Sequence, residues 1–162
     1  MRAIDVEIAV VNLFGHRRTV MVPNVYWGLG LRHEADLICL DPQGRFTEVE
    51  IKVSKSDLKA DLRKTHNHWS SIISRLVYAM PEELIPVAKQ ILPRHAGLIS
   101  VQYQPAGKTT LKMPVAYWVR ISKHNSLRPS QNQIQDFMRL GCMRIWSLKQ
   151  HYYQNHYRQR NP

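Results

Sequence analysis

Apolar residues in this chain fall mostly into short runs bounded by proline, glycine and polar residues, a pattern typical of strands. Residues 35–40 and 46–53 are two such runs, and the Pro-Gln-Gly turn between them predicts a hairpin. Residues 19–22, 76–80 and 97–103 are further runs that we expect to form strands, the first of them ending at a proline. The hydrophobic pattern therefore predicts a sheet.

Two helices are expected to flank the first strands. Asp5 suits the N-terminal cap of the first helix, and Ile8 and Val11 mark its apolar side. Ser54 and Asp57 have the spacing of a capping box, so a second helix is expected to follow the hairpin directly.

The last third of the chain has the clearest helical pattern. Ser130 and Gln133 form another capping-box spacing, and apolar residues then recur at helical intervals. We therefore expect an appended C-terminal helix over residues 130–158. Residues 108–121 are ambiguous and are interpreted as an extended segment broken at Pro114.

Composition limits the class of protein. The chain has 162 residues and is 44% hydrophobic, enough for one compact domain over residues 1–162. The 23 lysines and arginines outnumber the 12 acidic residues, so the formal charge is +11. This balance favours a polyanionic partner, most often nucleic acid or an anionic membrane surface, with a solvated basic surface as the alternative.

The sequence lacks an apolar stretch long enough for a secretory signal or a membrane span. Its two cysteines, Cys39 and Cys142, are too far apart to indicate a disulfide framework or a zinc site. We therefore expect a cytoplasmic protein that does not bind a membrane.

A group of carboxylates changes this picture. Glu48, Glu50 and Lys52 alternate along the third expected strand and so share one face, where Glu34 and Asp36 can meet them across the hairpin. Four carboxylates on one sheet face are costly unless something cationic lies among them. The pattern is that of a magnesium-dependent nuclease. A solvated ladder of surface salt bridges is the alternative.

Each member of the group suits a step of phosphodiester hydrolysis. Asp36 and Glu50 are the expected ligands of Mg²⁺, for which Mn²⁺ is expected to substitute, and the backbone carbonyl of Ile51 is a further candidate. Lys52 is expected to orient or deprotonate the attacking water, or to stabilise negative charge in the transition state. Glu34 or Glu48 is expected to bind a second metal or to shape the site.

Asp36 at the start of one strand and Glu50-Ile51-Lys52 in the next resemble the motif of the PD-(D/E)xK nuclease superfamily. The usual proline before the aspartate is replaced here by Ala35. The resemblance implies an α/β fold with a restriction-endonuclease-like αβββαβ core and a mixed central sheet, to which this chain adds its long C-terminal helix. It also implies metal-dependent cleavage of DNA in repair, recombination or phage DNA metabolism.

The sequence after this motif looks like the branch typified by MmcB-like DNA-repair proteins. In that branch a helix carries a spaced Asp-Asp-Lys set, which Asp57, Asp61 and Lys64 match. These residues would support the metal ligands, or else pair with one another on the helix surface. His66 would face the phosphate if the helix points its C-terminal end at the site, and Glu7 is the candidate for an acidic residue on the first helix. The resemblance is expected to cover the first hundred residues and to exclude the C-terminal helix.

Basic side chains are expected to bind the DNA backbone. The candidates are Lys59, Arg63, Lys64, Arg139 and Arg144. Two alternatives remain open: a non-catalytic module of the same fold that binds DNA structures, and a basic scaffold protein that acts through its C-terminal helix. The apolar stripe of that helix also suits a homodimer.

Overall fold

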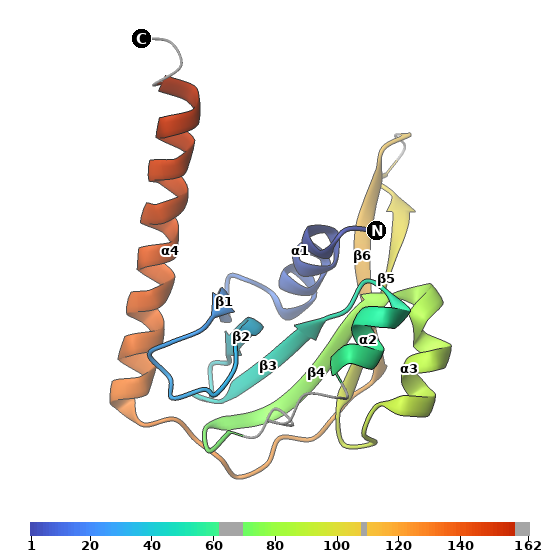
Figure 1. The fold of residues 1–162 in the computed structure, drawn as a ribbon, viewed down its shortest axis with the longest axis horizontal. Coiled ribbons are helices and arrows are strands. Elements are labelled where there is room, and N and C mark those ends of the chain that lie inside the picture. Colours follow the sequence, from blue (N-terminus) through green and yellow to red (C-terminus); the bar gives the residue numbers. More distant parts are fainter. Residues whose placement is uncertain (62–69, 108–109, 158–162) are drawn as a thin grey trace.

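A computed structural model of the protein describes residues 1–61, 70–107 and 110–157. Within these ranges, six strands form one open sheet in the order β1-β2-β3-β4-β5-β6, with helices on both faces (Figure 1). In chain order the elements are α1 (Ala3–Phe14), β1 (Val20–Val25), β2 (Ala35–Leu40), β3 (Phe46–Ile51), α2 (Lys55–Asp61), β4 (Ile73–Pro81), the 3₁₀ turn η1 (Glu82–Leu84), α3 (Ile85–Ile91), β5 (Gly97–Pro105), β6 (Lys112–Arg120) and α4 (Gln131–Tyr157). The predicted α/β class, mixed sheet and long C-terminal helix are confirmed.

Strand direction changes across the sheet. β2 is antiparallel to both of its neighbours, β1 and β3, whereas β3, β4 and β5 are parallel, and β6 returns antiparallel to β5. Both parallel connections contain a helix, α2 after β3 and α3 after β4. β3 consequently lies in the interior of the sheet, and every one of its residues is buried.

The two faces of the sheet have different neighbours. On one face Val49 and Ile51 pack with the α1 residues Val6 and Val10. The opposite face carries two separate apolar clusters, one with Phe137 of α4 and one with residues of α2, α3, β4 and β5. Because successive residues of a strand point to opposite faces, the even-numbered residues of β3 point away from α1. The carboxylates of β3 therefore lie between these two clusters.

The predicted phase of the first helix is wrong. Val6, Ala9 and Val10 are buried, whereas Ile8 is 44% exposed. The helix begins at Ala3, so Asp5 stands inside its first turn rather than at the cap. The error has a simple cause: apolar residues are so frequent in this segment that more than one stripe satisfies the helical period.

Both prolines that were expected to end or break a strand lie inside one. Pro23 pairs with Leu37 within β1, and Pro114 pairs with Tyr103 within β6. β1 and β6 are the two edges of the sheet, where a residue without an N–H can leave its open side toward solvent. Edge position could not be known from the local sequence.

α4 begins where it was expected and then extends beyond the sheet. The Ser130 N–H donates to Oε1 of Gln133 at 2.8 Å, and the Gln133 N–H donates to Oγ of Ser130 at 3.3 Å, which confirms the capping box. Phe137 is fully buried, and its ring lies 4.9 Å from that of Phe46. The second half of the helix extends beyond the sheet (Figure 1). Its observed end, Tyr157, is the last described residue.

Within the described ranges, no helix combines the length and the apolar character needed to cross a membrane.

Candidate functional site

The candidate site lies where β2 and β3 separate. Their pairing runs from Leu40 opposite Phe46 to Leu37 opposite Val49. Beyond that point the Oδ2 atom of Asp36 accepts a hydrogen bond of 2.7 Å from the Ile51 N–H. A side chain thus takes the place of a backbone partner, and it fixes the Asp36 carboxylate beside the end of β3.

The three residues expected to be catalytic meet at this point. Lys52 Nζ lies 2.6 Å from Oε2 of Glu50 and 3.9 Å from Oδ2 of Asp36. The side chains of Glu50 and Lys52 are buried, whereas that of Asp36 is 39% exposed. The group therefore has a buried interior and one end, at Asp36, that solvent reaches.

The burial of the β3 side chains rules out the alternative interpretation, a solvated ladder of surface salt bridges. Glu48, Glu50 and Lys52 are only 0%, 1% and 3% exposed. Burial raises the pKa of Glu50, the Lys52 ammonium opposes this rise, and the negative charge of Asp36 adds to it. Ionised carboxylates in such a position need cations close to them.

His33 is a site residue that the sequence reasoning missed. Its Nε2 atom lies 2.8 Å from Oε1 of Glu48, and its side chain is 5% exposed. One ligand atom each from His33, Glu48 and Glu50 can be chosen so that all three lie within 4.8 Å of one another. A signal was present, because His33 precedes Glu34 and Asp36 at the start of the hairpin. The pairing with Glu48 is not local and had no signal.

The donor set fits a divalent cation. Two carboxylates and an imidazole nitrogen converge here, and imidazole suits Mn²⁺ or other transition metals, whereas Mg²⁺ prefers oxygen alone. Asp36 is not a member of this group, and Glu34 is exposed and outside it. The expected pairing of Asp36 with Glu50 is instead made through Lys52. The ligand role of the Ile51 carbonyl remains a prediction.

Asp57 shapes the turn that follows the site. Its N–H donates to Ser54 Oγ at 3.1 Å, and its Oδ2 atom accepts from the Val53 N–H at 3.4 Å. The predicted capping box is therefore half formed, because Ser54 accepts from the Asp57 N–H, whereas the Asp57 carboxylate accepts from Val53 rather than from Ser54. α2 then begins at Lys55. A role of Asp57 in supporting the metal ligands remains a prediction.

The other residues predicted from the helix motif are placed only in part. Lys59 is exposed on α2, and Asp61 is the last residue of that helix. Arg63, Lys64 and His66 lie outside the described residues.

Both arginines of α4 that were expected to bind DNA also contact the protein itself. Arg139 Nη1 lies 3.1 Å from Oδ1 of Asp136. Arg144 donates from Nη2 to the carbonyl of Asn24 at 2.5 Å, which fastens α4 to the end of β1. Their roles toward DNA remain predictions.

Glu7 lies on α1. Its side chain is partly buried, and burial together with the negative charge of Asp36 raises its pKa. Its role as the acidic residue of the first helix remains a prediction.

Comparison with known proteins identifies a family. The model of the family described as DNA repair protein MmcB-like matches residues 1–150. This span includes most of α4, so the expectation that the resemblance excludes the C-terminal helix is wrong. A protein of unknown function from Silicibacter pomeroyi shares the fold, with a TM-score of 0.69 at 20% identity over 92% of each chain. No protein of curated function matches the sequence.

Proposed function

Because the chain belongs to the MmcB-like DNA repair protein family, we propose that it acts on DNA, as a metal-dependent nuclease of the PD-(D/E)xK type. The observation that carries the proposal is the meeting of Asp36, Glu50 and Lys52 where β2 and β3 separate. Structural salt bridges rarely need a buried lysine between two carboxylates of neighbouring strands, whereas hydrolysis of a phosphodiester does need an ammonium beside acidic ligands.

The chain offers a distinct task to each residue. His33, Glu48 and Glu50 would hold a divalent cation, with Asp36 at the end open to substrate. When bound, such a cation supplies charge neutralisation at the phosphate and a more acidic water. Lys52 holds a positive charge where negative charge develops on the phosphoryl oxygens, and its burial strengthens that interaction.

The position of the site suits a large substrate. Val49 and Ile51, the neighbours of Glu50 along β3, are packed in the apolar core, so the backbone that carries Glu50 and Lys52 is held in place, while Asp36 remains partly exposed to an approaching phosphate. The formal charge of +11 attracts the DNA backbone to the protein.

The test is cleavage of labelled single-stranded, duplex, flap and four-way-junction DNA with Mn²⁺, Mg²⁺ or EDTA. Asp36→Asn keeps the side-chain volume and is partly exposed, so it should fold and lose at least about 100-fold in rate. Lys52→Ala should lose as much, whereas Lys55→Ala, which removes an exposed lysine of α2, should cut normally.

If the wild-type protein binds DNA but does not cleave it with any of the metals, the proposed nuclease activity is contradicted. That result would favour the non-catalytic module of the same fold. Equal cleavage by the wild-type and Asp36→Asn proteins would place the chemistry elsewhere.

We further propose that the overhanging half of α4 pairs with a second copy of this chain. Ile145 and Leu148 are 55% and 70% exposed. Each stands about three helical turns after a residue that packs on the body of the protein, Ile134 and Phe137 respectively. The stripe that is buried in the first half of the helix thus continues uncovered in the second.

A further inference from the structure

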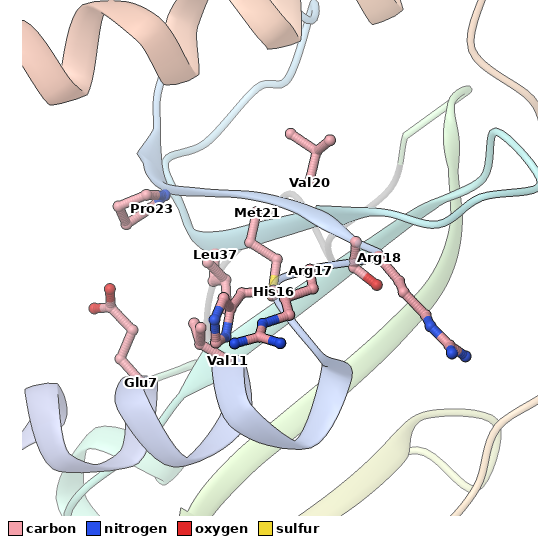
Figure 2. A pocket seen from close by; sticks show the side chains of 10 residues that line it. Glu7, Val11, His16, Arg17, Arg18, Val20, Met21, Pro23 and Leu37 are labelled. Atoms are coloured by element: carbon pink, nitrogen blue, oxygen red, sulfur yellow. The ribbon is translucent and has the colours of Figure 1, made fainter.

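A cavity of about 410 Å³ lies between α1 and the edge strand β1 (Figure 2). Its volume is within the range of small-molecule sites. The lining residues run from Glu7 at one end to Arg18 at the other. Leu37, which also lines the cavity, follows Asp36 in β2, so the cavity and the candidate site share this strand.

The two parts of the cavity differ in chemistry. Val11, Met21 and Leu37 form an apolar floor. His16, Arg17 and Arg18 are exposed at the far end, directly after α1. Figure 2 shows His16 and Arg17 close to Val11 and Leu37, whereas Arg18 extends away from Glu7.

The two arginines are available to a ligand. Among the described residues, no carboxylate lies within ion-pair distance of Arg17 or Arg18. The end of α1 is already closed by other groups, because Gly15 N–H donates to the Val11 carbonyl and the Thr19 hydroxyl donates to that of Phe14. The arginines are thus not needed to cap the helix.

We propose that this cavity binds one unpaired nucleotide of the DNA substrate, so that the preferred substrate is single-stranded, frayed or flapped. The inference rests on the proposed action on DNA. An apolar floor beside a cationic rim matches a nucleotide, whose base or sugar packs on the floor and whose phosphate meets Arg17 and Arg18. Glu7 repels a phosphate at the opposite end, which sets the direction of the nucleotide.

Base pairing explains the choice of substrate. A nucleotide in a duplex has its base stacked and turned toward its partner, so it must leave the helix to reach such a floor. An unpaired nucleotide enters without that cost.

DNA binding is measured in EDTA, which chelates divalent cations and so prevents metal-dependent cleavage during the measurement. Fluorescence anisotropy gives the affinity for a single-stranded oligonucleotide and for a blunt duplex of equal length at several salt concentrations. The wild-type protein should prefer the single strand. Arg17→Gln/Arg18→Gln should weaken its binding by about fivefold or more and lower the salt slope by about one to two.

The matched control is Lys89→Gln/Arg94→Gln, which removes two exposed charges near α3 and should retain both affinity and preference. Equal losses in the two double variants, or an unchanged preference in Arg17→Gln/Arg18→Gln, would overturn the cavity as a nucleotide site.

The NMR chemical shift of the Met21 methyl group gives a second measure of binding, because Met21 lines the apolar floor of the cavity. Titration of a deoxynucleoside monophosphate should shift it in the wild-type and control proteins and leave it unmoved in Arg17→Gln/Arg18→Gln. An unmoved signal in the wild-type protein counts against the cavity. A protein that shows these effects but cuts no DNA would refute the nuclease and retain the nucleotide site.

Discussion

Single ionisable residues decide what the candidate site can hold. Glu48 and Glu50 are buried on a central strand, where an unpaired carboxylate would be far more costly than at the surface. Lys52 offsets the charge of Glu50, and His33 lies against Glu48. Because one donor is an imidazole, the site is expected to favour Mn²⁺ over Mg²⁺.

Replacing His33 should therefore change metal preference. In His33→Ala we expect the rise in melting temperature produced by Mn²⁺ to fall to the small rise produced by Mg²⁺, because both cations then meet oxygen ligands only. The measurement is a thermal melt of each protein at increasing metal concentration. His95→Ala, at an exposed position, is the control. A Mn²⁺ response that survives in His33→Ala would remove His33 from the ligand set.

His124 makes stability depend on pH. Burial lowers its pKa from 6.5 to about 4, and the positive charges of Arg75 and Arg45 contribute. Its Nδ1 atom lies 2.6 Å from Ser74 Oγ. Between pH 6.5 and 4 the unfolded chain binds the proton and the folded protein does not, so stability is complete above this window and is lost as pH falls through it.

The unfolding free energy should consequently decrease more in the wild-type protein than in His124→Asn when pH falls from 7.5 to 4.5. The expected difference is about 2 kcal/mol. Urea unfolding at both pH values measures it, and comparing the two proteins cancels the groups that they share. Parallel pH profiles would show that His124 does not cause the loss.

At the scale of elements, the edges of the sheet explain most departures from expectation. β1 and β6 continue through Pro23 and Pro114 because, in the part of the chain that the structure describes, no further strand pairs with their outer sides. α4 covers β1, since Phe137 packs on Phe46 and Gly141 lies close to Val22, with 3.2 Å between the position of a Cβ at Gly141 and Val22 Cγ2. The first half of α4 is therefore part of the core.

Neighbouring positions on α4 should respond very differently to truncation. Phe137→Ala should lower the unfolding free energy by about 3–5 kcal/mol, because it leaves a cavity against Phe46. Met138→Ala, at a position 47% exposed, should lower it by less than about 1 kcal/mol. Denaturant unfolding of both variants measures the difference. Similar small losses would mean that α4 does not stabilise the sheet.

At the scale of the whole molecule, charge and apolar surface point to two different partners. The protein is strongly basic, and the sequence after Asp136 contains no acidic residue. Salt therefore weakens its attraction to DNA, but it screens the repulsion between two overhanging helices.

The proposed dimer should accordingly become more stable as salt is added. Sedimentation of the wild-type protein should show a larger dimer fraction at high salt, and Ile145→Ser/Leu148→Ser should remain monomeric with an unchanged melting temperature. Met143→Ser, at an exposed position off the stripe, is the control and should dimerise. A wild-type monomer at all salt concentrations would refute the pairing.

The short-range pattern of residues was sufficient to predict which side chains of β3 share a face and where two of the helices begin. Residues two apart on a strand share a face whatever the strand packs against, so the grouping of Glu48, Glu50 and Lys52 followed from the sequence. The starts of α2 and α4 followed for the same reason, because Ser54 and Asp57, like Ser130 and Gln133, contact each other within one turn.

Tertiary structure alone decided the features that depend on distant residues. The burial of the carboxylates, the contact between His33 and Glu48, and the phase of α1 all require knowledge of which elements lie side by side. Likewise, the edge position that tolerates Pro23 is a property of the assembled sheet. The physical reason is that periodicity constrains each element separately, whereas burial and long-range pairing arise only when all the elements pack together.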